Sequence, residues 1–389
     1  MTGLKLLLIA GELSGDRLGG ALMDGLVSET SGNVIFFGVG GPMMQAAGMT
    51  SLFDMSDLSV MGLVEVLPKI PMLLSRVNTT SKAVIAARPD ALITIDSPDF
   101  CLRVAEKVRK VLPDLKIIHY VAPSVWAWRP ERAANMAKHV DHVLALLPFE
   151  PPYMKAAGMT CDFVGHPVIS EPKPSDTDIV ELRNALDLGD GPIVTVLPGS
   201  RVGEINRMGP IFESVLENIQ SSHPNVEFIL PVAASVEELV KQKTSHWSIK
   251  PKLLLNEGYT SEKVESRKRT AYKLSDAALA TSGTVALELA AQNCPMVVAY
   301  RANWATTRMV KKLAQIDTAN LINIVTDTRV VPEHLFENCT VDNITNSLRQ
   351  LLDGKSRQSD ALAQTMIALG QGQKDAHLWA AKSVLRAIK

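Results

Sequence analysis

Residues 276–290 read Asp-Ala-Ala-Leu-Ala-Thr-Ser-Gly-Thr-Val-Ala-Leu-Glu-Leu-Ala, DAALATSGTVALELA. The apolar run at its start predicts a buried strand, and the run after Ser282-Gly283-Thr284 predicts a helix with Glu288 early in it. A strand that passes through such a turn into a helix is the unit of an α/β fold. The turn itself has two readings. Ser and Thr cap helices and Glu suits a first helical turn, or the same groups bind a ligand.

The alternation of strands and helices continues on both sides of this stretch. The predicted strands cover 5–10, 33–40, 91–96, 115–121, 142–147, 161–165, 192–201, 226–233, 252–258, 276–283 and 295–301. Most of these runs are continuously apolar, which indicates burial on both faces and therefore a parallel sheet. Residues 165–178 are rich in Pro, Ser and Asp and predict a linker. We expect two doubly wound Rossmann-like domains, 1–168 and 169–340, and a helical segment 341–389.

Length and composition narrow the class of protein. A chain of 389 residues favours two domains, and 46% hydrophobic with 21% charged residues describes a folded globular protein. The net charge of −1 gives no indication of nucleic-acid binding. Four scattered cysteines without CxxC spacing predict buried thiols in a reducing compartment. Without an apolar run of about 18 residues, we expect a cytosolic protein or one attached to a membrane only by its surface.

In the first half, polar residues follow the predicted strands. Glu12 and Ser14 lie in the turn GELSGDRLGG, which lacks GxGxxG and so does not predict a dinucleotide site. An ordinary capping turn is an equal alternative there. Asp96 ends the strand ALITID without a capping role, and His119 begins the loop HYVAPSVWAWRPER. Because ligands of parallel sheets bind beyond the carboxyl ends of strands, these residues are candidates for a site.

In the second half, two turns meet at one predicted edge. Gly199, Ser200 and Arg201 of LPGSR offer backbone N–H groups and a guanidinium, which suit a phosphate. The turn Ser282-Gly283-Thr284 would face the same crevice and hold a diphosphate at a helix N-terminus. Glu288, one turn into that helix, would accept hydrogen bonds from ribose hydroxyls. Together these residues predict a sugar-nucleotide site.

Several motifs, in order, resemble the lipid-A-disaccharide synthase family, the inverting glycosyltransferases of family 19: AGELSGDRLGG, GVGGPMMQAAGM, IDSPDF, HYVAPSVWAWRPER, LPGSR and SGTVALELA. The resemblance spans about residue 5 to the C-terminus. It implies a GT-B fold, two domains facing a cleft with C-terminal helices returning to the first. It also implies transfer of 2,3-diacylglucosamine from UDP to 2,3-diacylglucosamine 1-phosphate (lipid X), without a metal cofactor.

The resemblance assigns roles to individual residues. Asp96 matches the essential aspartate and expected general base, and Glu12 and Ser14 match the acceptor side, where His119 is a further candidate. The residues matched to the UDP-sugar site are Gly199, Ser200, Arg201, Ser282, Gly283, Thr284, Glu288 and Asn323. Ile322 stands where the family usually has Pro before that asparagine.

The acyl chains of both substrates require an apolar surface. Residues 60–77 are dense in apolar side chains, and the candidates are Met61, Leu63, Leu67, Met72, Leu73 and Leu74. Pro68 and Pro71 favour an irregular, exposed segment over a buried helix pair. We therefore expect peripheral attachment to the cytosolic face of the inner membrane, and we allow a homodimer.

Other functions remain open from the residues alone. A UDP-N-acetylglucosamine 2-epimerase or a peptidoglycan-precursor glycosyltransferase would keep a UDP site in the second half. Neither explains APSVWAWRPER together with the apolar 60–77 stretch. A module that binds a UDP-sugar without turning it over is a weaker alternative, and a dehydrogenase is weaker still.

Overall fold

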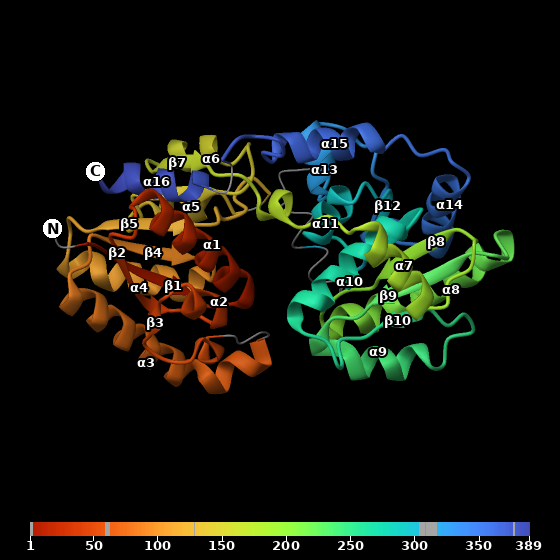
Figure 1. Cartoon of the computed structure of the whole chain (residues 1–389), viewed down its shortest axis with the longest axis horizontal. Helices are drawn as coiled ribbons and strands as arrows, with labels where there is room; N and C mark the ends of the chain where they lie inside the picture. Colours follow the sequence, from red (N-terminus) through yellow and green to blue (C-terminus); the bar gives the residue numbers. More distant parts are fainter. Residues whose placement is uncertain (1–2, 59–62, 128, 303–307, 309–316, 376–377) are drawn as a thin grey trace. The chain divides into compact units, whose positions relative to one another are not determined.

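A computed structural model of the chain describes residues 3–58, 63–127, 129–302, 308, 317–375 and 378–389, with side chains from residue 68 onward in the second of these ranges. The chain folds as two compact units. Met1–Pro167 and Leu369–Lys389 form the first, and Val168–Ala368 form the second (Figure 1). Each unit is a parallel sheet with helices between successive strands.

The first unit contains a seven-stranded sheet of order β3-β2-β1-β4-β5-β6-β7, in which all paired strands are parallel. The strands are β1 (Leu4–Ala10), β2 (Val34–Val39), β3 (Thr50–Ser51), β4 (Ala91–Ile95), β5 (Lys116–Tyr120), β6 (His142–Ala145) and β7 (Thr160–Phe163). The six predicted strands are confirmed to within a few residues. The two-residue β3 was missed because it is too short to show a pattern.

Helices bury both faces of this sheet. They are α1 (Leu13–Glu29), α2 (Pro42–Ala46), α3 (Leu63–Ala87), α4 (Pro98–Val111), α5 (Glu131–Met136), α6 (Pro151–Ala156) and α16 (Trp379–Ile388), with the short 3-10 turn η1 (Met55–Asp57). A second 3-10 turn, η2 (Pro167–Ser170), begins at the last residue of the N-terminal segment and continues into the second unit. Leu7 and Leu92 share a buried cluster with side chains of α3 and α4. Leu8 and Ile93 share another with α1 and α16. Burial on both faces explains the continuous apolar runs.

The second unit contains a six-stranded parallel sheet of order β10-β9-β8-β11-β12-β13. Its strands are β8 (Ile193–Leu197), β9 (Glu227–Pro231), β10 (Lys252–Leu254), β11 (Ala277–Ala280), β12 (Met296–Tyr300) and β13 (Glu333–Leu335). The last was missed, since Glu-His-Leu is half-buried and carries no apolar run. The helices are α7 (Asp176–Ala185), α8 (Val202–Ser222), α9 (Glu237–Thr244), α10 (Ser261–Leu274), α11 (Val285–Ala291), α13 (Leu321–Thr326), α14 (Val341–Leu352) and α15 (Ser359–Ala368), with 3-10 turns η3 (Ala234–Val236) and η4 (Phe336–Asn338).

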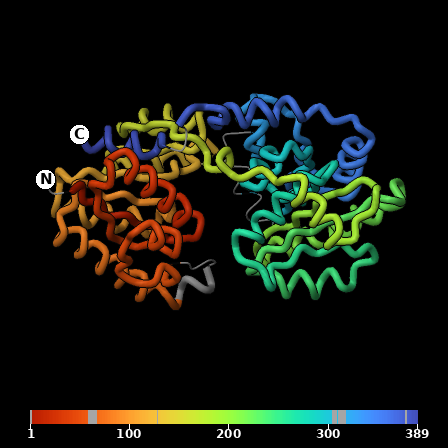
Figure 2. The backbone as a smooth tube through the Cα atoms, viewed as in Figure 1, coloured from red at the N-terminus to blue at the C-terminus, as the bar shows by residue number. Residues whose placement is uncertain are grey.

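The C-terminal segment does not behave as one piece. The expectation that all of 341–389 packs on the first domain is wrong for α14 and α15, which belong to the second unit. Ile344 and Leu348 of α14 are buried there, in one cluster with residues of α8. Only the chain from Leu369 onward joins the first unit, where the blue end of the trace lies beside the N-terminal part (Figure 2).

Polar contacts fasten α16 to the first sheet. The Nε2 atom of His142 in β6 lies 2.8 Å from Oγ of Ser383, and that hydroxyl donates to Asp162 at 2.7 Å. Arg386 also donates to Asp162, at 2.8 Å. Because His142 and Ser383 are buried, these bonds fix the helix to the edge of the sheet that β6 and β7 form.

The expectation of an irregular segment around Pro68 and Pro71 is wrong, because both prolines lie inside the single helix α3. Each proline removes one intrahelical N–H donor, which weakens the first turns of a helix. The later turns compensate through packing: Val77 and Val84 are buried in the core of the first unit. Tertiary burial thus outweighs the local preference of the two prolines.

Candidate active site

Asp96 immediately follows the central strand β4, and its backbone is unusual. Asp96 has φ 51° and Ser97 has φ 43°, so two consecutive residues other than glycine adopt the left-handed conformation. The N–H of Asp96 donates to the carbonyl of Tyr120 in β5 at 2.9 Å, which holds the turn against the next strand. A left-handed residue with a side chain carries strain of about 1–2 kcal/mol, and such strain concentrates at functional sites.

The strained turn is also packed against the end of β1. A Cβ placed on Gly11 would lie 2.5 Å from Oγ and 2.9 Å from Cβ of Ser97, which is closer than real atoms approach. Only glycine therefore allows the Ser97 side chain to occupy its position. Val121, at the end of β5, is left-handed as well, with φ 82°. Three unfavourable backbone conformations thus gather at one edge of the sheet.

Glu12 and Ser14 stand where α1 begins, beside Gly11. Glu12 occupies the N-cap position, and its side chain does not cap the helix. The Ser14 side chain is exposed. The residue with the structural role is Asp16, which is 1% exposed. Its carboxylate accepts N–H groups from Gly41, Met43 and Met44 at the start of α2. Glu12 and Ser14 therefore follow β1, the neighbour of the strand that Asp96 follows, and Asp16 ties their helix to the start of α2.

His119 does not join these residues. It lies inside β5, is 1% exposed, and its Nδ1 atom is 2.8 Å from the hydroxyl of Thr94 in β4. Burial lowers the pKa of His119 to about 4, so the ring is neutral near pH 7. The acceptor-side role expected for His119 is corrected to a structural role within the sheet. Its position next to a motif loop misled the sequence reading.

The tryptophan loop is anchored inside the first unit. Trp126 is 8% exposed, its indole donates to Glu150 at 3.4 Å, and it packs edge-to-face on Phe149 with ring centroids 5.1 Å apart. Burial raises the pKa of Glu150 to about 7. Trp126 therefore braces the loop rather than forming an open wall, and Trp128 lies outside the described residues.

In the second unit the turn after β8 is relaxed and exposed. Gly199 has φ 122°, and a Cβ on it would meet the Glu204 side chain at 2.5 Å. The Ser200 N–H donates to Glu204 at 3.0 Å, and Nη1 of Arg201 lies 3.3 Å from the same carboxylate. The Arg201 side chain is 67% exposed. Arg201 therefore stands at the start of α8, loosely held by an acid of its own helix.

The turn after β11 lies next to this one. The Thr281 N–H donates to the carbonyl of Leu197 at 3.0 Å, so the ends of β11 and β8 are joined. Gly283 and Thr284 are exposed and Ser282 is half-buried. Thr284 makes no side-chain cap, so the capping interpretation fails for it. The two predicted turns are thus confirmed as neighbours at one edge of the second sheet.

Glu288 is half-buried in α11 and is held from α10. Lys268 Nζ lies 3.2 Å from Oε2 of Glu288 and 2.7 Å from Oε2 of Glu265. Burial of Lys268 lowers its pKa, the two carboxylates raise it, and the net shift is upward. The lysine therefore stays charged and orients the Glu288 carboxylate. The sequence reading missed Lys268 because it lies 20 residues away on another helix.

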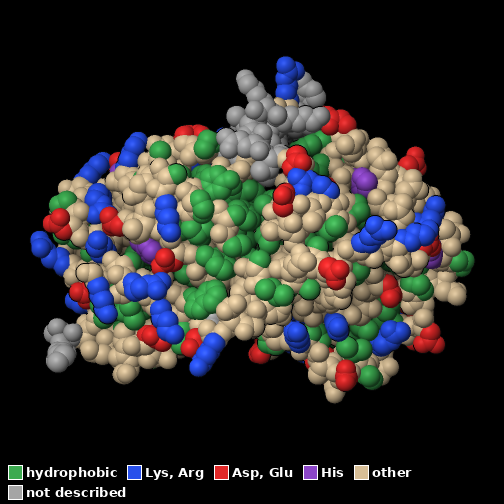
Figure 3. Space-filling model, turned by 90° about the horizontal axis from the view of Figure 1, so that it is seen from above, with side chains coloured by type: hydrophobic (Ala, Val, Ile, Leu, Met, Phe, Trp, Pro, Cys, Tyr) green, Lys and Arg blue, Asp and Glu red, His purple; other side chains and the backbone are tan. Residues whose placement is uncertain are grey.

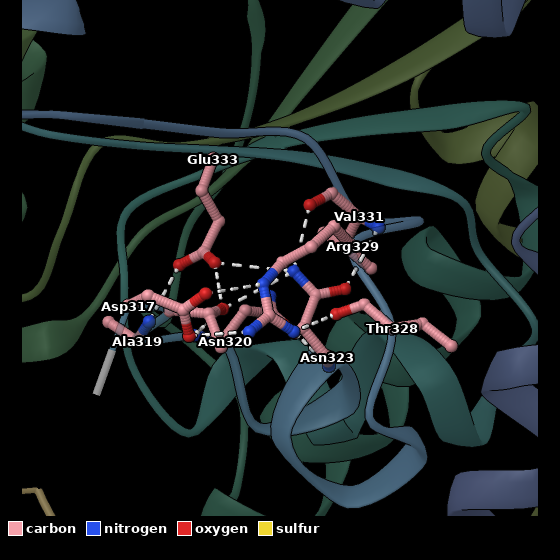
Figure 4. A network of polar contacts seen from close by, with 9 residues as sticks. Asp317, Ala319, Asn320, Asn323, Thr328, Arg329, Val331 and Glu333 are labelled. Carbon is pink, nitrogen blue, oxygen red and sulfur yellow. Dashed lines mark hydrogen bonds and ion pairs between the residues drawn. The ribbon is translucent and has the colours of Figure 1, made fainter.

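Asn323 is completely buried and uses its amide within the fold (Figure 4). Its Nδ2 donates to the Val331 carbonyl at 3.0 Å and to Glu333 at 3.2 Å, and its Oδ1 accepts the Val331 N–H at 3.1 Å. Asn320 caps α13 by accepting the N–H of Ile322 at 2.9 Å. The expected direct contact of Asn323 with the UDP-sugar is therefore corrected: its side chain fastens α13 to the segment before β13.

The predicted acyl surface is described in part. Met61 lies outside the described residues, as do the side chains of Leu63 and Leu67 in α3. Met72 and Leu73 are half-buried, Leu74 is 45% exposed, and Ile70 is 39% exposed. Ile70 was not among the chosen candidates. In the part of the chain that the structure describes, no helix is long and apolar enough to cross a membrane.

On the face drawn in Figure 3, basic and acidic side chains are interspersed, in keeping with the small net charge. All four cysteines are buried and unpaired. Within the described ranges, no three His, Cys, Asp or Glu side chains gather closely enough to hold a metal ion. Whether the reaction depends on a metal stays a prediction.

Solved structures define the class of protein. The chain is similar to a putative UDP-N-acetylglucosamine 2-epimerase from Listeria monocytogenes, with a TM-score of 0.67, 15% identity, and 100% and 96% of the two chains covered. It is also similar to an E. coli structure described as trehalose-6-phosphate bound with UDP-2-fluoro glucose, with a TM-score of 0.60, 13% identity and 99% of each chain covered. The two sheets are thus those of the GT-B class, and at this identity only the fold is shared.

Sequence relatives define the family. A family model for lipid-A-disaccharide synthetase matches residues 6–384. The lipid-A-disaccharide synthase of Ruegeria pomeroyi is 50% identical over 98% of this chain and 95% of its own length. The chain belongs to the lipid-A-disaccharide synthetase family and is a glycosyltransferase of lipid A biosynthesis. The epimerase alternative is not supported beyond the shared fold.

Proposed function

We propose that the chain transfers 2,3-diacylglucosamine from UDP-2,3-diacylglucosamine to 2,3-diacylglucosamine 1-phosphate (lipid X), with inversion and release of UDP. Membership of the family supports this choice of substrates. The observation that carries it is the carboxylate of Asp96, held at the end of the central strand by a strained turn. A carboxylate in a fixed position at a strand end is suited to act as a general base.

On the acceptor side, Asp96 takes the proton from the attacking hydroxyl of lipid X. The hydroxyl oxygen forms the new bond to the anomeric carbon from the face opposite the leaving group, which inverts that centre. Glu12 and Ser14, at the neighbouring strand end, orient the acceptor sugar. Because all three residues lie at the carboxyl edge of the first sheet, one bound sugar can reach them.

On the donor side, the bond between the anomeric carbon and the diphosphate oxygen breaks, and UDP leaves with the electron pair. Arg201 and the backbone of Gly199 and Ser200 stabilise the charge that develops on the diphosphate. Ser282, Gly283 and Thr284 hold the same group from the adjoining turn, and Glu288 accepts hydrogen bonds from the ribose. We propose that this set of groups works without a metal cofactor.

A transfer assay tests this function. Radiolabelled UDP-2,3-diacylglucosamine is incubated with the full chain with and without lipid X, and the product mass is measured. We expect a disaccharide 1-phosphate and UDP only when lipid X is present. Epimerised UDP-sugar formed without lipid X would instead support the epimerase alternative, and binding without any product would support a non-catalytic module.

We further propose that α3 contacts the cytosolic face of the inner membrane. Ile70 and Leu74 present exposed apolar side chains, and Lys69 lies beside them in the sequence, whereas Arg76 is paired with Asp57 at 2.6 Å. Apolar insertion would dominate, and anionic lipids would add about 1 kcal/mol per cation near the surface. A homodimer stays a prediction.

Liposome binding tests the membrane proposal. Changing Met72, Leu73 and Leu74 together to Ser should weaken binding to phosphatidylglycerol vesicles and raise the KM for lipid X. A second variant, Ile70→Ser with Leu74→Ser, alters only exposed side chains and so avoids damage to the core. The control is Val180→Ser in α7, a residue of the second unit that is 56% exposed. Unchanged vesicle binding by both α3 variants would refute the proposal.

A further inference from the structure

Arg207 lies in the second helical turn of α8. It is about two helical turns beyond Gly199, where the predicted phosphate-binding segment begins. Helical side chains lean toward the N-terminus of their helix, and a long one reaches the preceding turn. The guanidinium of Arg207 does so. Its Nη2 and Nη1 atoms lie 3.5 and 3.7 Å from the place of a Cβ on Gly203. Arg207 therefore brings a second guanidinium to the first turn of α8, close to Arg201 in the chain.

This guanidinium lacks a partner. Among the residues that the structure describes, Arg207 has no hydrogen bond or ion pair, and its Nε atom is buried without an acceptor. By comparison, Arg183 in α7 is also half-buried and donates to the Gly189 carbonyl at 2.7 Å. A buried polar donor without an acceptor destabilises a fold, and more so when it is charged. The position of Arg207 needs another explanation than stability.

The charges around Arg207 are also unfavourable for a cation, which adds an electrostatic mismatch to the missing partner. The first turn of a helix carries a partial positive charge, which disfavours a cation there. Glu204 is the acidic residue of this turn, and it already accepts from Ser200 and pairs with Arg201. An anion bound at the turn would remove the mismatch, since it would supply acceptors for the unpaired donors.

We propose that Arg207 binds the diphosphate of the nucleotide donor together with Arg201. The proposal rests on the assignment of the donor site to the turn after β8. In this proposal the two arginines contribute differently to binding. Arg207 is half-buried and already in place, whereas Arg201 is exposed and must leave Glu204 to reach the ligand. A guanidinium that is already in position loses little conformational entropy on binding, so most of the free energy of its hydrogen bonds adds to the affinity.

Calorimetric titration of the full chain with UDP, UMP and uridine tests the proposal. Arg207→Met keeps the apolar stem and removes the charged donors. We expect UDP affinity to fall about 10- to 100-fold, as for loss of a charge-assisted hydrogen bond. UMP affinity should fall less, and uridine affinity should not change. Arg207→Lys should retain part of the UDP affinity, and the matched control Arg183→Met should bind UDP like the wild type.

The melting temperature separates this role from a structural one. Because Arg207 is unpaired in the fold, Arg207→Met should melt no lower than the wild type. Normal UDP affinity in Arg207→Met, while Arg201→Met loses affinity, would overturn the proposal for Arg207 alone. Equal losses for UDP and uridine would also overturn it and show a packing role. Normal UDP binding in both variants would refute the whole donor site at this turn.

Discussion

The turn after β4 and the turn after β8 each lie at the carboxyl edge of a parallel sheet, yet they are built differently. Asp96 and Ser97 are left-handed residues with side chains, tied to Tyr120 and packed on Gly11. The turn after β8 takes its left-handed residue from Gly199 and leaves Arg201 67% exposed. A general base must sit at one place relative to the attacked proton, which justifies strain. A diphosphate offers many acceptors, so its turn can remain adjustable.

The largest effect is expected when the proposed general base in the strained turn after β4 is removed. Asp96→Asn should lower turnover roughly 10²-fold or more, because it removes the general base while the turn keeps its shape. The measurement is kcat for transfer to lipid X, with UDP affinity as the control for an intact second unit. Near-normal turnover would remove Asp96 from its role and direct attention to Glu12.

The next effect concerns the shape of the same turn. Gly11→Ala should displace Ser97 and with it Asp96, and a shift of about 1 Å in a catalytic group lowers the rate up to about 10²-fold. UDP affinity should stay normal. The double variant Gly11→Ala with Ser97→Gly removes the clashing side chain and should recover most of the activity of Ser97→Gly. Gly209→Ala in α8, where the added Cβ meets only ordinary contacts, is the control. Absence of rescue would show that Gly11 acts otherwise.

In the turn after β8, a substitution should lower turnover more than it lowers the stability of the fold. Arg201→Ala should lower kcat about 10-fold or more, because the charge on the departing UDP grows as the bond breaks. The melting temperature should hardly change, since an exposed pair such as Arg201–Glu204 contributes about 0–1 kcal/mol. If kcat is preserved and only the fold is weakened, the turn is structural rather than catalytic.

The smallest effect is expected at the ribose contact. Glu288→Ala should chiefly raise the KM for the donor, because a ribose contact changes little along the reaction. Lys268→Met should reproduce a milder form of this change, since Lys268 orients that carboxylate. Binding of 2′,3′-dideoxy-UDP should be the same in both variants as in the wild type. A drop in its affinity equal to that for UDP would contradict the ribose assignment.

Local patterns predicted most of the elements of this fold. The apolar runs of β1, β4, β8 and β11 are unambiguous because their strands are buried on both faces. Sequence patterns did not predict the elements whose conformation depends on tertiary contacts. β3 and β13 are too short or too polar to be seen, and α3 remains helical through Pro68 and Pro71 because its later turns are buried.

The candidate site shows the same division. The positions of Asp96, Arg201 and the Ser282–Thr284 turn at strand ends followed from the alternation of strands and helices, which places all βα turns of a parallel sheet at one edge. The environment of each side chain did not follow. His119 and Asn323 belong to motifs, yet both are buried and hydrogen-bonded within the fold.

The sequence by itself therefore determined the α/β class, the order of the strands and βα turns along the chain, and the family to which the chain belongs. Only the tertiary structure decided which motif residues face outward and which partners they hold. Lys268 reaches Glu288 from another helix, Ser97 meets Gly11 from another strand, and Arg207 folds back over Gly203. Hydrophobic periodicity is a property of neighbours along the chain, whereas hydrogen bonds and unpaired charges depend on residues that packing brings together.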